Sequence, residues 1–404
     1  MRAFVVCSVI AFAAAATLLA QGSPFDYTQW RGLNRDGSAS AFAEPRAWPG
    51  QLTRKWKVEV GEGYATPILS GRVVYVFTRR DGNEGLTALD ADTGRERWRS
   101  QYAAPYTPSQ PAAAHGAGPK ATPLLHGGKL FTLGISGIVT AFDATTGARV
   151  WQTPAPSEPP FFSAASSPVA DGRLVMAHPG NYGPLTAYDA PTGAVVWTAG
   201  DGGFFASPIV VTLSGVRQVV TMTQSAVIGV SLPDGTVLWR YPLSGANGGG
   251  PTPVVDADTI MFSVGQGTIA IRPTFKDGLW SASEVWQTKD VSMYISTPVV
   301  VGNTLYGLST RSSGQFYATD TRSGETLWLG PPRQAANTAL VKAGRLLFYL
   351  DDDGELIVAP SSRTRFEPLK RYKVAGSATW AQPMISGKRI FIKDVSSLTL
   401  WTVD

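Results

Sequence analysis

The sequence predicts an all-β protein: an eight-bladed β-propeller of four-stranded antiparallel blades, closed by an N-terminal strand that completes the last blade. Three observations lead to this prediction: a composition rich in turn-forming residues, a Thr/Ser-Pro motif that recurs about every forty-five residues, and a Trp that opens the fourth strand of most repeats. The 43 glycines and 29 prolines among 404 residues exceed the usual share, and a hydrophobic share of 44% is enough for a packed core.

The Thr/Ser-Pro motif marks the start of the innermost strand of each repeat. Alternating apolar residues follow each copy, then a Gly turn and a second apolar run, which is the pattern of a β-hairpin. The copies occur at Thr66-Pro67, Thr122-Pro123, Ser167-Pro168, Ser207-Pro208, Thr252-Pro253 and Thr297-Pro298, with degenerate copies at Thr338-Ala339 and Gln382-Pro383.

A second motif, Ala-x-Asp-x-x-x-Gly-x-x-x-Trp, closes the repeat. We expect the Asp carboxylate to accept backbone N–H groups in a turn and the Gly to adopt positive φ. The Trp is expected to lie between neighbouring blades with its indole N–H on a carbonyl oxygen. We therefore assign these residues a structural role in the blade. The clearest copies are Asp90, Gly94 and Trp98; Asp143, Gly147 and Trp151; Asp189, Gly193 and Trp197; and Asp320, Gly324 and Trp328.

The count of fourth strands predicts how the ring closes. The first such strand begins at Trp56, before any hairpin, whereas the last hairpin, within 384–403, has no fourth strand after it. We expect residues 56–60 to complete the last blade, because this closure hides sheet edges that could pair with other chains. The predicted organisation is a signal peptide at 1–20, an N-terminal extended segment at 21–53 and the propeller at 54–404.

The first twenty residues have the pattern of a secretory signal peptide. Arg2 precedes the apolar run 3–20, and the small residue Ala20 stands where cleavage would occur. An uncleaved anchor helix is the alternative. No later segment has the length and apolarity of a transmembrane helix, so we expect a mature chain without a membrane span, in the periplasm or secreted.

The composition excludes several kinds of site. The single cysteine, Cys7, lies in the predicted signal peptide, so we expect the mature chain to have no disulfide, thiolate nucleophile or cysteine-ligated metal. The three histidines form no His-x-x-x-His pair, and the sequence identifies no metal ligand set. The 35 basic and 30 acidic residues form no basic stripe, which argues against nucleic acid as a partner.

The Ala-x-Asp-x-x-x-Gly-x-x-x-Trp pattern resembles the pyrroloquinoline quinone (PQQ) enzyme repeat over nearly the whole mature chain. That family includes the quinoprotein alcohol dehydrogenases and non-catalytic relatives such as the lipoprotein subunit of the outer-membrane β-barrel assembly machinery. The resemblance implies the propeller fold and says little about activity, because the repeat is the blade itself. This chain is shorter than the dehydrogenases and lacks their adjacent-cysteine disulfide, and their calcium-binding Glu, Asn and Asp match no motif here.

Loops that lead into the innermost strands of a propeller converge on its central funnel, so we expect any ligand site there. His115 is a candidate for acid–base chemistry or quinone contact, and Lys120 for binding an anion; the alternative for His115 is a structural loop histidine. The candidate funnel residues are Glu62, Tyr64, His115, Lys120, Asp201, Asn247, Tyr294, Asn337 and Trp380, joined by the aromatic residues Phe161, Phe162, Phe204 and Phe205.

These observations favour a monomeric ligand- or protein-binding scaffold without evident catalytic machinery, whose partner is a cell-envelope protein or a small molecule in the funnel. The alternative is a compact PQQ-dependent dehydrogenase that oxidises an alcohol or sugar with PQQ and Ca²⁺ bound in the funnel. A divalent metal would draw its ligands from Glu62, Asp201, Asn247 and Asn337. A hydrolase, which would need paired carboxylates, is a third hypothesis.

Overall fold

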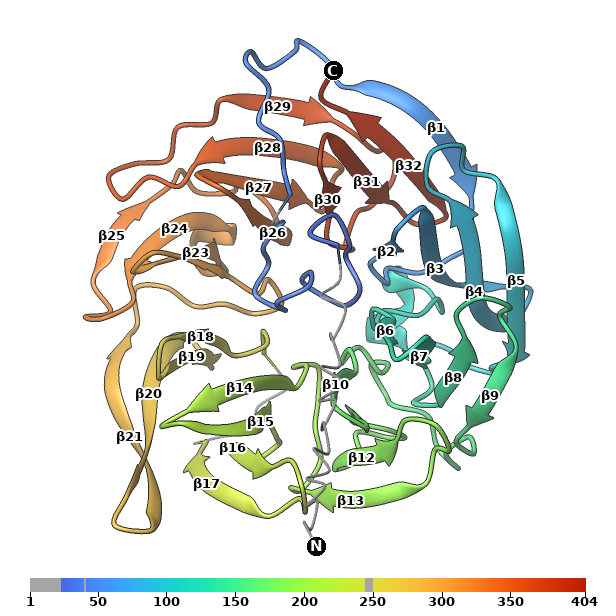
Figure 1. The fold of residues 1–404 in the computed structure, drawn as a ribbon. Coiled ribbons are helices and arrows are strands. Elements are labelled where there is room, and N and C mark those ends of the chain that lie inside the picture. Colours follow the sequence, from blue (N-terminus) through green and yellow to red (C-terminus); the bar gives the residue numbers. More distant parts are fainter. Residues whose placement is uncertain (1–22, 40, 244–249) are drawn as a thin grey trace, which may run out of the picture.

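The computed structural model describes residues 23–39, 41–243 and 250–404, and the predicted signal peptide lies outside these ranges. Within them, 32 strands form eight four-stranded antiparallel sheets. The sheets are arranged as blades around a central axis (Figure 1). The predicted eight-bladed propeller is therefore confirmed. No helix of the described part is long and apolar enough to cross a bilayer.

Each of the first seven blades is built from four consecutive strands, the first nearest the axis and the fourth on the outside. Blades 1 and 2 comprise β2 (Ile68–Ser70), β3 (Val73–Arg80), β4 (Asn83–Asp90) and β5 (Glu96–Ala103), and β6 (Leu124–His126), β7 (Lys129–Leu133), β8 (Val139–Asp143) and β9 (Arg149–Gln152). Blades 3 and 4 comprise β10 (Val169–Asp171), β11 (Leu174–Ala177), β12 (Leu185–Asp189) and β13 (Val195–Ala199), and β14 (Ile209–Leu213), β15 (Val216–Met222), β16 (Ala226–Ser231) and β17 (Val237–Pro242).

Blades 5 and 6 comprise β18 (Val254–Asp256), β19 (Thr259–Val264), β20 (Gly267–Lys276) and β21 (Leu279–Thr288), and β22 (Val299–Val301), β23 (Thr304–Ser309), β24 (Gln315–Asp320) and β25 (Thr326–Leu329). Blade 7 comprises β26 (Thr338–Ala343), β27 (Leu346–Asp351), β28 (Glu355–Pro360) and β29 (Lys370–Lys373). Two short 3₁₀ helices lie in loops: η1 (Gln110–His115) between blades 1 and 2, and η2 (Arg311–Ser313) inside blade 6.

The eighth blade joins the two ends of the chain, as the sequence predicts. Its inner strands are β30 (Met384–Ser386), β31 (Arg389–Lys393) and β32 (Ser397–Thr402), and its outer strand is β1 (Thr53–Glu59). Strand β1 runs antiparallel to β32, with Thr53 opposite Thr402 and Glu59 opposite Ser397. In Figure 1 the blue strand β1 lies beside the red strand β32. The last hairpin thus has its outer edge covered.

The second motif joins neighbouring blades through its Gly and Trp. Gly147 and Gly193 have φ of +74° and +75°, and a Cβ atom at either would lie 2.5 or 2.6 Å from the indole of Trp98 or Trp151 in the preceding blade. These positions therefore require glycine both for the turn and for the close approach of the ring. Asp143 accepts the backbone N–H of Thr146 at 2.8 Å in the same turn. Indole N–H groups donate to carbonyl oxygens of the next blade from Trp151 to Ala190, from Trp197 to Leu232 and from Trp328 to Ser362, at 2.8 to 2.9 Å.

A chain of hydrogen bonds runs around the axis through the Thr/Ser-Pro motif. The backbone N–H of Thr122 donates to Ser167 Oγ at 2.9 Å, and that of Ser167 donates to Ser207 Oγ at 2.9 Å. Each hydroxyl is an acceptor for the blade before it, which explains why the motif uses Ser and Thr. The same contact joins Thr66 to Thr122, Ser207 to Thr252, Thr252 to Thr297 and Gln382 to Thr66.

The segment before β1 crosses the centre of the ring (Figure 1). Its residues 30–37, called the plug below, carry two buried arginines. Their guanidinium groups donate to carbonyl oxygens of the Thr/Ser-Pro motifs: Arg31 to those of Thr297 and Pro298 at 3.1 and 2.6 Å, and Arg35 to those of Ser167, Pro168 and Pro208 at 2.6, 3.0 and 2.9 Å. The plug thereby holds blades 3, 4 and 6 together.

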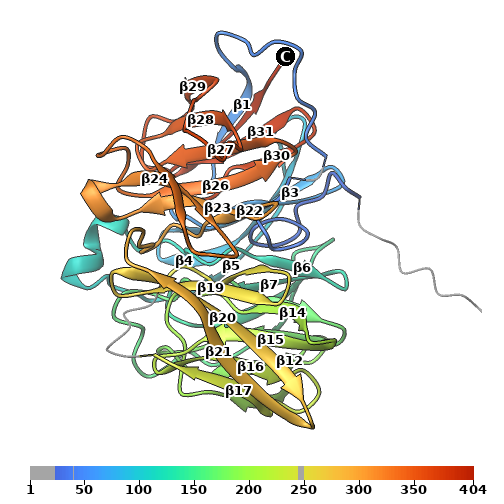
Figure 2. The same cartoon turned by 90° about the vertical axis from the view of Figure 1, so that its left-hand side faces the viewer.

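Contacts on either side fix the plug in the ring. Before it, Tyr27 forms a backbone bridge with Leu69 of blade 1, and after it, Ser38 forms one with Lys342 of blade 7. The Lys342 ammonium lies 2.9 Å from the Asp36 carboxylate. Figure 2 shows the N-terminal segment, in blue, on the opposite face of the ring from the teal helix η1. One face of the propeller is therefore closed by the chain's own N-terminal segment.

Candidate functional site

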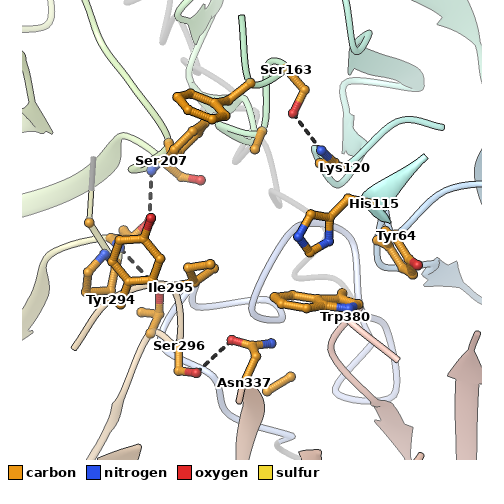
Figure 3. A pocket seen from close by; sticks show the side chains of 18 of the residues that line it. Tyr64, His115, Lys120, Ser163, Ser207, Tyr294, Ile295, Ser296, Asn337 and Trp380 are labelled. Atoms are coloured by element: carbon orange, nitrogen blue, oxygen red, sulfur yellow. Dashed lines mark hydrogen bonds between the residues drawn. The ribbon is translucent and has the colours of Figure 1, made fainter. Parts of the chain in front are cut away.

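A cavity of about 340 Å³ lies at the axis of the propeller, between the plug and the loops that lead into the innermost strands. Its volume lies in the range typical of small-molecule sites. The structure brings six of the nine predicted funnel residues into its lining: Tyr64, His115, Lys120, Tyr294, Asn337 and Trp380 (Figure 3). Phe162 and Phe205, from the predicted aromatic loops, line it as well.

One wall of the cavity is a pair of aromatic rings from two loops. Helix η1 starts with a proline in its first turn and ends at Gly116, whose φ is +65°, and it places His115 against Trp380 of the loop before blade 8. The two rings meet edge to face, with their centroids 4.6 Å apart and their planes at 88°. Burial, and then repulsion from Lys120, lower the pKa of His115 below its usual value. Both effects favour the neutral imidazole.

Lys120 is the cation of the cavity. Its ammonium donates to Ser163 Oγ at 2.9 Å (Figure 3). Among the described residues, no carboxylate lies within 4 Å of that ammonium, although fifteen ion pairs form elsewhere in the same part of the chain. Burial lowers the pKa of Lys120 to about 8, because an unpaired charge is costly to remove from water.

The partner of Lys120 has an unusual backbone conformation. Ser163 is buried and has φ of +91°, a region that residues other than glycine rarely adopt. Strained residues of this kind persist only where the surrounding structure holds them, and they cluster at functional sites. Ser163 therefore marks the loop before blade 3 as a part of the cavity that is held in place.

The floor of the cavity is Trp30 of the plug. The guanidinium carbons of Arg31 and Arg35 both lie 5.5 Å from the centre of its ring, so the indole is held by cation–π contacts. Sequence reasoning missed Trp30, because nothing in a segment outside the repeats indicates that it returns to the axis. The one signal in the sequence is the pair of arginines, Arg31 and Arg35, that follows Trp30.

The remaining predicted residues lie elsewhere. Glu62 is exposed and bridges the backbone of Arg79, and Asp201 is exposed and accepts a hydrogen bond from the Ser225 hydroxyl. Neither lines the cavity. Asn247 lies outside the described residues. Of the three described residues among the four metal ligands that the dehydrogenase alternative would use, Asn337 alone lines the cavity, and its Oδ1 already accepts a hydrogen bond from Ser296 at 2.8 Å.

The lining fits a flat organic anion and does not fit a divalent cation. Trp30 and Trp380 contribute indole surface to the lining, and Lys120 contributes a positive charge. A calcium ion needs six to eight oxygen ligands, mostly carboxylates and carbonyls. In the described part of the chain, however, no three His, Cys, Asp or Glu side chains gather as a metal site would require. The residues present thus suit the carboxylated quinone PQQ as an anion, but not a Ca²⁺ ion beside it.

Comparisons with known proteins agree with the repeat and the fold. A curated relative, outer membrane protein assembly factor BamB of Yersinia pestis, is 26% identical over 330 residues, which make up 77% of this chain and 68% of the relative. A europium-containing methanol dehydrogenase superposes with a TM-score of 0.63 at 13% identity, over 94% of this chain and 98% of its own. The quinohemoprotein alcohol dehydrogenase from Comamonas testosteroni gives 0.64 at 14% identity, over 94% and 80%.

At such low identities the two dehydrogenase structures show the fold alone. The family comparison goes further: the model of the family described as outer membrane protein assembly factor BamB matches residues 46–160 and 82–330. Since these stretches together cover more than half of the sequence, the chain belongs to this family of PQQ-repeat propellers.

Proposed function

We propose that this chain is a periplasmic or secreted binding propeller that holds an organic anion, free or carried by a protein, in the axial cavity. The observation that carries the proposal is Lys120, a largely buried ammonium whose one side-chain partner among the described residues is the Ser163 hydroxyl. A carboxylate that enters the cavity would give this ammonium the charged partner that the described residues do not supply.

The expected gain in affinity follows from the strength of such a contact. A charge-assisted hydrogen bond contributes roughly 1.5–3 kcal/mol, which corresponds to about one to two orders of magnitude in affinity. The aromatic walls add stacking for a flat apolar group next to the carboxylate. The Yersinia pestis relative is an outer membrane protein assembly factor, which supports binding over catalysis for this chain as well.

The proposal is tested by titrating the purified protein with aromatic carboxylates and with their uncharged amides, following tryptophan fluorescence. We expect the acids to quench it saturably and the amides to bind at least tenfold more weakly. Lys120→Gln should remove this preference, whereas the same change at the exposed Lys289 should leave it intact. Equal affinity for acid and amide in the wild-type protein would contradict the proposal.

The PQQ-dependent dehydrogenase is the alternative, favoured by aromatic walls and a cation that suit a planar carboxylated quinone. PQQ, when bound, would supply a two-electron acceptor, which Lys120 and Trp380 would hold and orient. The same titration with PQQ, with and without Ca²⁺, separates the two functions. PQQ binding that requires Ca²⁺, together with alcohol oxidation in the presence of an artificial electron acceptor, would favour the dehydrogenase.

A further inference from the structure

A group of aromatic side chains extends from the cavity onto the outer surface. We call it the aromatic ridge: Phe161, Phe162, Tyr182, Phe204 and Phe205, from the loops that precede blades 3 and 4 and from the β11–β12 connection. Phe162 and Phe205 line the cavity, while Phe161 is 57% exposed. The ridge is thus continuous from the inside of the cavity to the solvent.

Contacts between its members make the ridge an ordered surface. Tyr182 and Phe204 stack face to face, with centroids 4.4 Å apart and planes at 7°, and Phe161 meets Phe162 edge to face at 4.8 Å. The Tyr182 hydroxyl accepts the backbone N–H of Phe162 at 2.7 Å. A second apolar pair, Tyr294 and Ile295, stands across the opening, 60% and 51% exposed. Exposed apolar groups of this size, next to a cavity, are typical of interaction surfaces.

The shape and charge of the cavity restrict what can bind on this surface. Trp30 and the plug close its far end, so an extended chain can enter the cavity with one of its ends but cannot pass through it. The charge inside is the Lys120 ammonium, which repels an N-terminal ammonium and attracts a C-terminal carboxylate. Apolar side chains just before that carboxylate would lie on the aromatic ridge as the chain leaves the cavity.

We propose that the cavity and the aromatic ridge bind the C-terminal end of an extended polypeptide. The α-carboxylate pairs with Lys120, and the last apolar side chains contact the ridge. This inference rests on the proposed function, since it names the carrier of the anion. Backbone-terminus capture of this kind is a known mode of peptide recognition, and here it would give a cell-envelope partner a defined point of attachment.

The test uses fluorescently labelled peptides of about eight residues that end in Phe, as free acid and as C-terminal amide, with fluorescence anisotropy as the readout. We expect the acid to bind at least tenfold more tightly than the amide. We expect Lys120→Gln to lower the affinity for the peptide acid to the affinity for the peptide amide. A peptide amide with a single internal Glu should bind as weakly as the plain amide, because only an end can enter.

A ridge variant distinguishes the peptide from a small anion. Phe161→Ser should lower the affinity for the peptide acid about tenfold and leave the affinity for a small aromatic carboxylate unchanged. Phe275→Ser, on the β20–β21 hairpin, is the matched control at an exposed Phe away from the ridge, and should change neither. If small carboxylates bind through Lys120 while the peptide acid and amide bind equally, this inference is wrong and the proposed function stands. If neither class shows a carboxylate preference, both fail.

Discussion

The two arginines of the plug and the lysine of the cavity are cations near the propeller axis, and they differ in what they contact. Arg31 and Arg35 of the plug donate to carbonyl oxygens of three blades, with five contacts of 2.6 to 3.1 Å. Lys120, in the cavity above them, donates to one hydroxyl. The guanidinium groups of the arginines have replaced their bonds to water with bonds to protein carbonyls, and they stabilise the ring. The Lys120 ammonium has only the Ser163 hydroxyl as a side-chain acceptor among the described residues. A buried cation with its acceptors in place is structural, and one without them is a candidate for ligand binding.

The largest expected effect is at the plug. Arg35→Met should lower the free energy of unfolding by about 3–5 kcal/mol, because the carbonyls of three residues lose a charged donor in a buried place. Urea unfolding at pH 7 measures it. Arg365→Met, at a side chain 70% exposed, is the control and should cost under about 0.5 kcal/mol. A cost at Arg35 no larger than that of the control would contradict the structural role.

Trp30 contacts the two arginines and lines the same cavity as Lys120, so changing it should affect stability and binding together. Trp30→Ala removes the ring that the two arginines hold and opens the floor of the cavity. We expect a loss of about 2 kcal/mol in unfolding free energy and about tenfold in affinity for an aromatic carboxylate. Trp280→Ala, on the β20–β21 hairpin, should leave that affinity unchanged. Unaltered ligand affinity in the Trp30 variant would remove Trp30 from the site.

The hydrogen-bond chain around the axis predicts a smaller effect. Ser207→Ala deletes the acceptor of the Ser167 backbone N–H, which is buried, so we expect about 1–2 kcal/mol of destabilisation. Ser283→Ala, at an exposed position on β21, should be neutral within about 0.5 kcal/mol. Thermal unfolding of both variants tests whether the motif hydroxyl acts as an inter-blade acceptor; matching melting temperatures would show that it does not.

The smallest effect has the opposite sign. Lys120→Met should raise the unfolding free energy at pH 7 by about 1 kcal/mol, because it removes a charge that burial disfavours. Since the pKa of Lys120 is about 8 in the folded state and its ordinary value is 10.5, the unfolded state binds more protons between these values, so wild-type stability should rise with pH in that window. The Met variant should lack this rise. Destabilisation by Lys120→Met at pH 7 would make Lys120 structural, like Arg35.

The sequence predicted the ring because each blade repeats its own local physics. Asp, Gly and Trp recur at fixed spacing for a turn, a positive φ and a ring that packs on the next blade, and the eight copies of the Thr/Ser-Pro motif, two of them degenerate, allowed the blades to be counted. It also placed Tyr64, His115 and Lys120 in loops that converge. Neither the place of Trp30 in the cavity nor the hydrogen bond from Lys120 to Ser163 could be found in this way, because both join segments far apart in the chain.

The closure of blade 8 also sets the order in which the molecule can fold. Strand β1 precedes every complete blade in the sequence, yet its partner β32 follows seven of them. While the chain folds, β1 and the plug lack their partners until the later blades have formed, and such distant pairings are slow to form. The pairing of β32 with β1 therefore closes the ring. A chain interrupted before Ser397 would keep an open sheet edge, which favours proteolysis and aggregation.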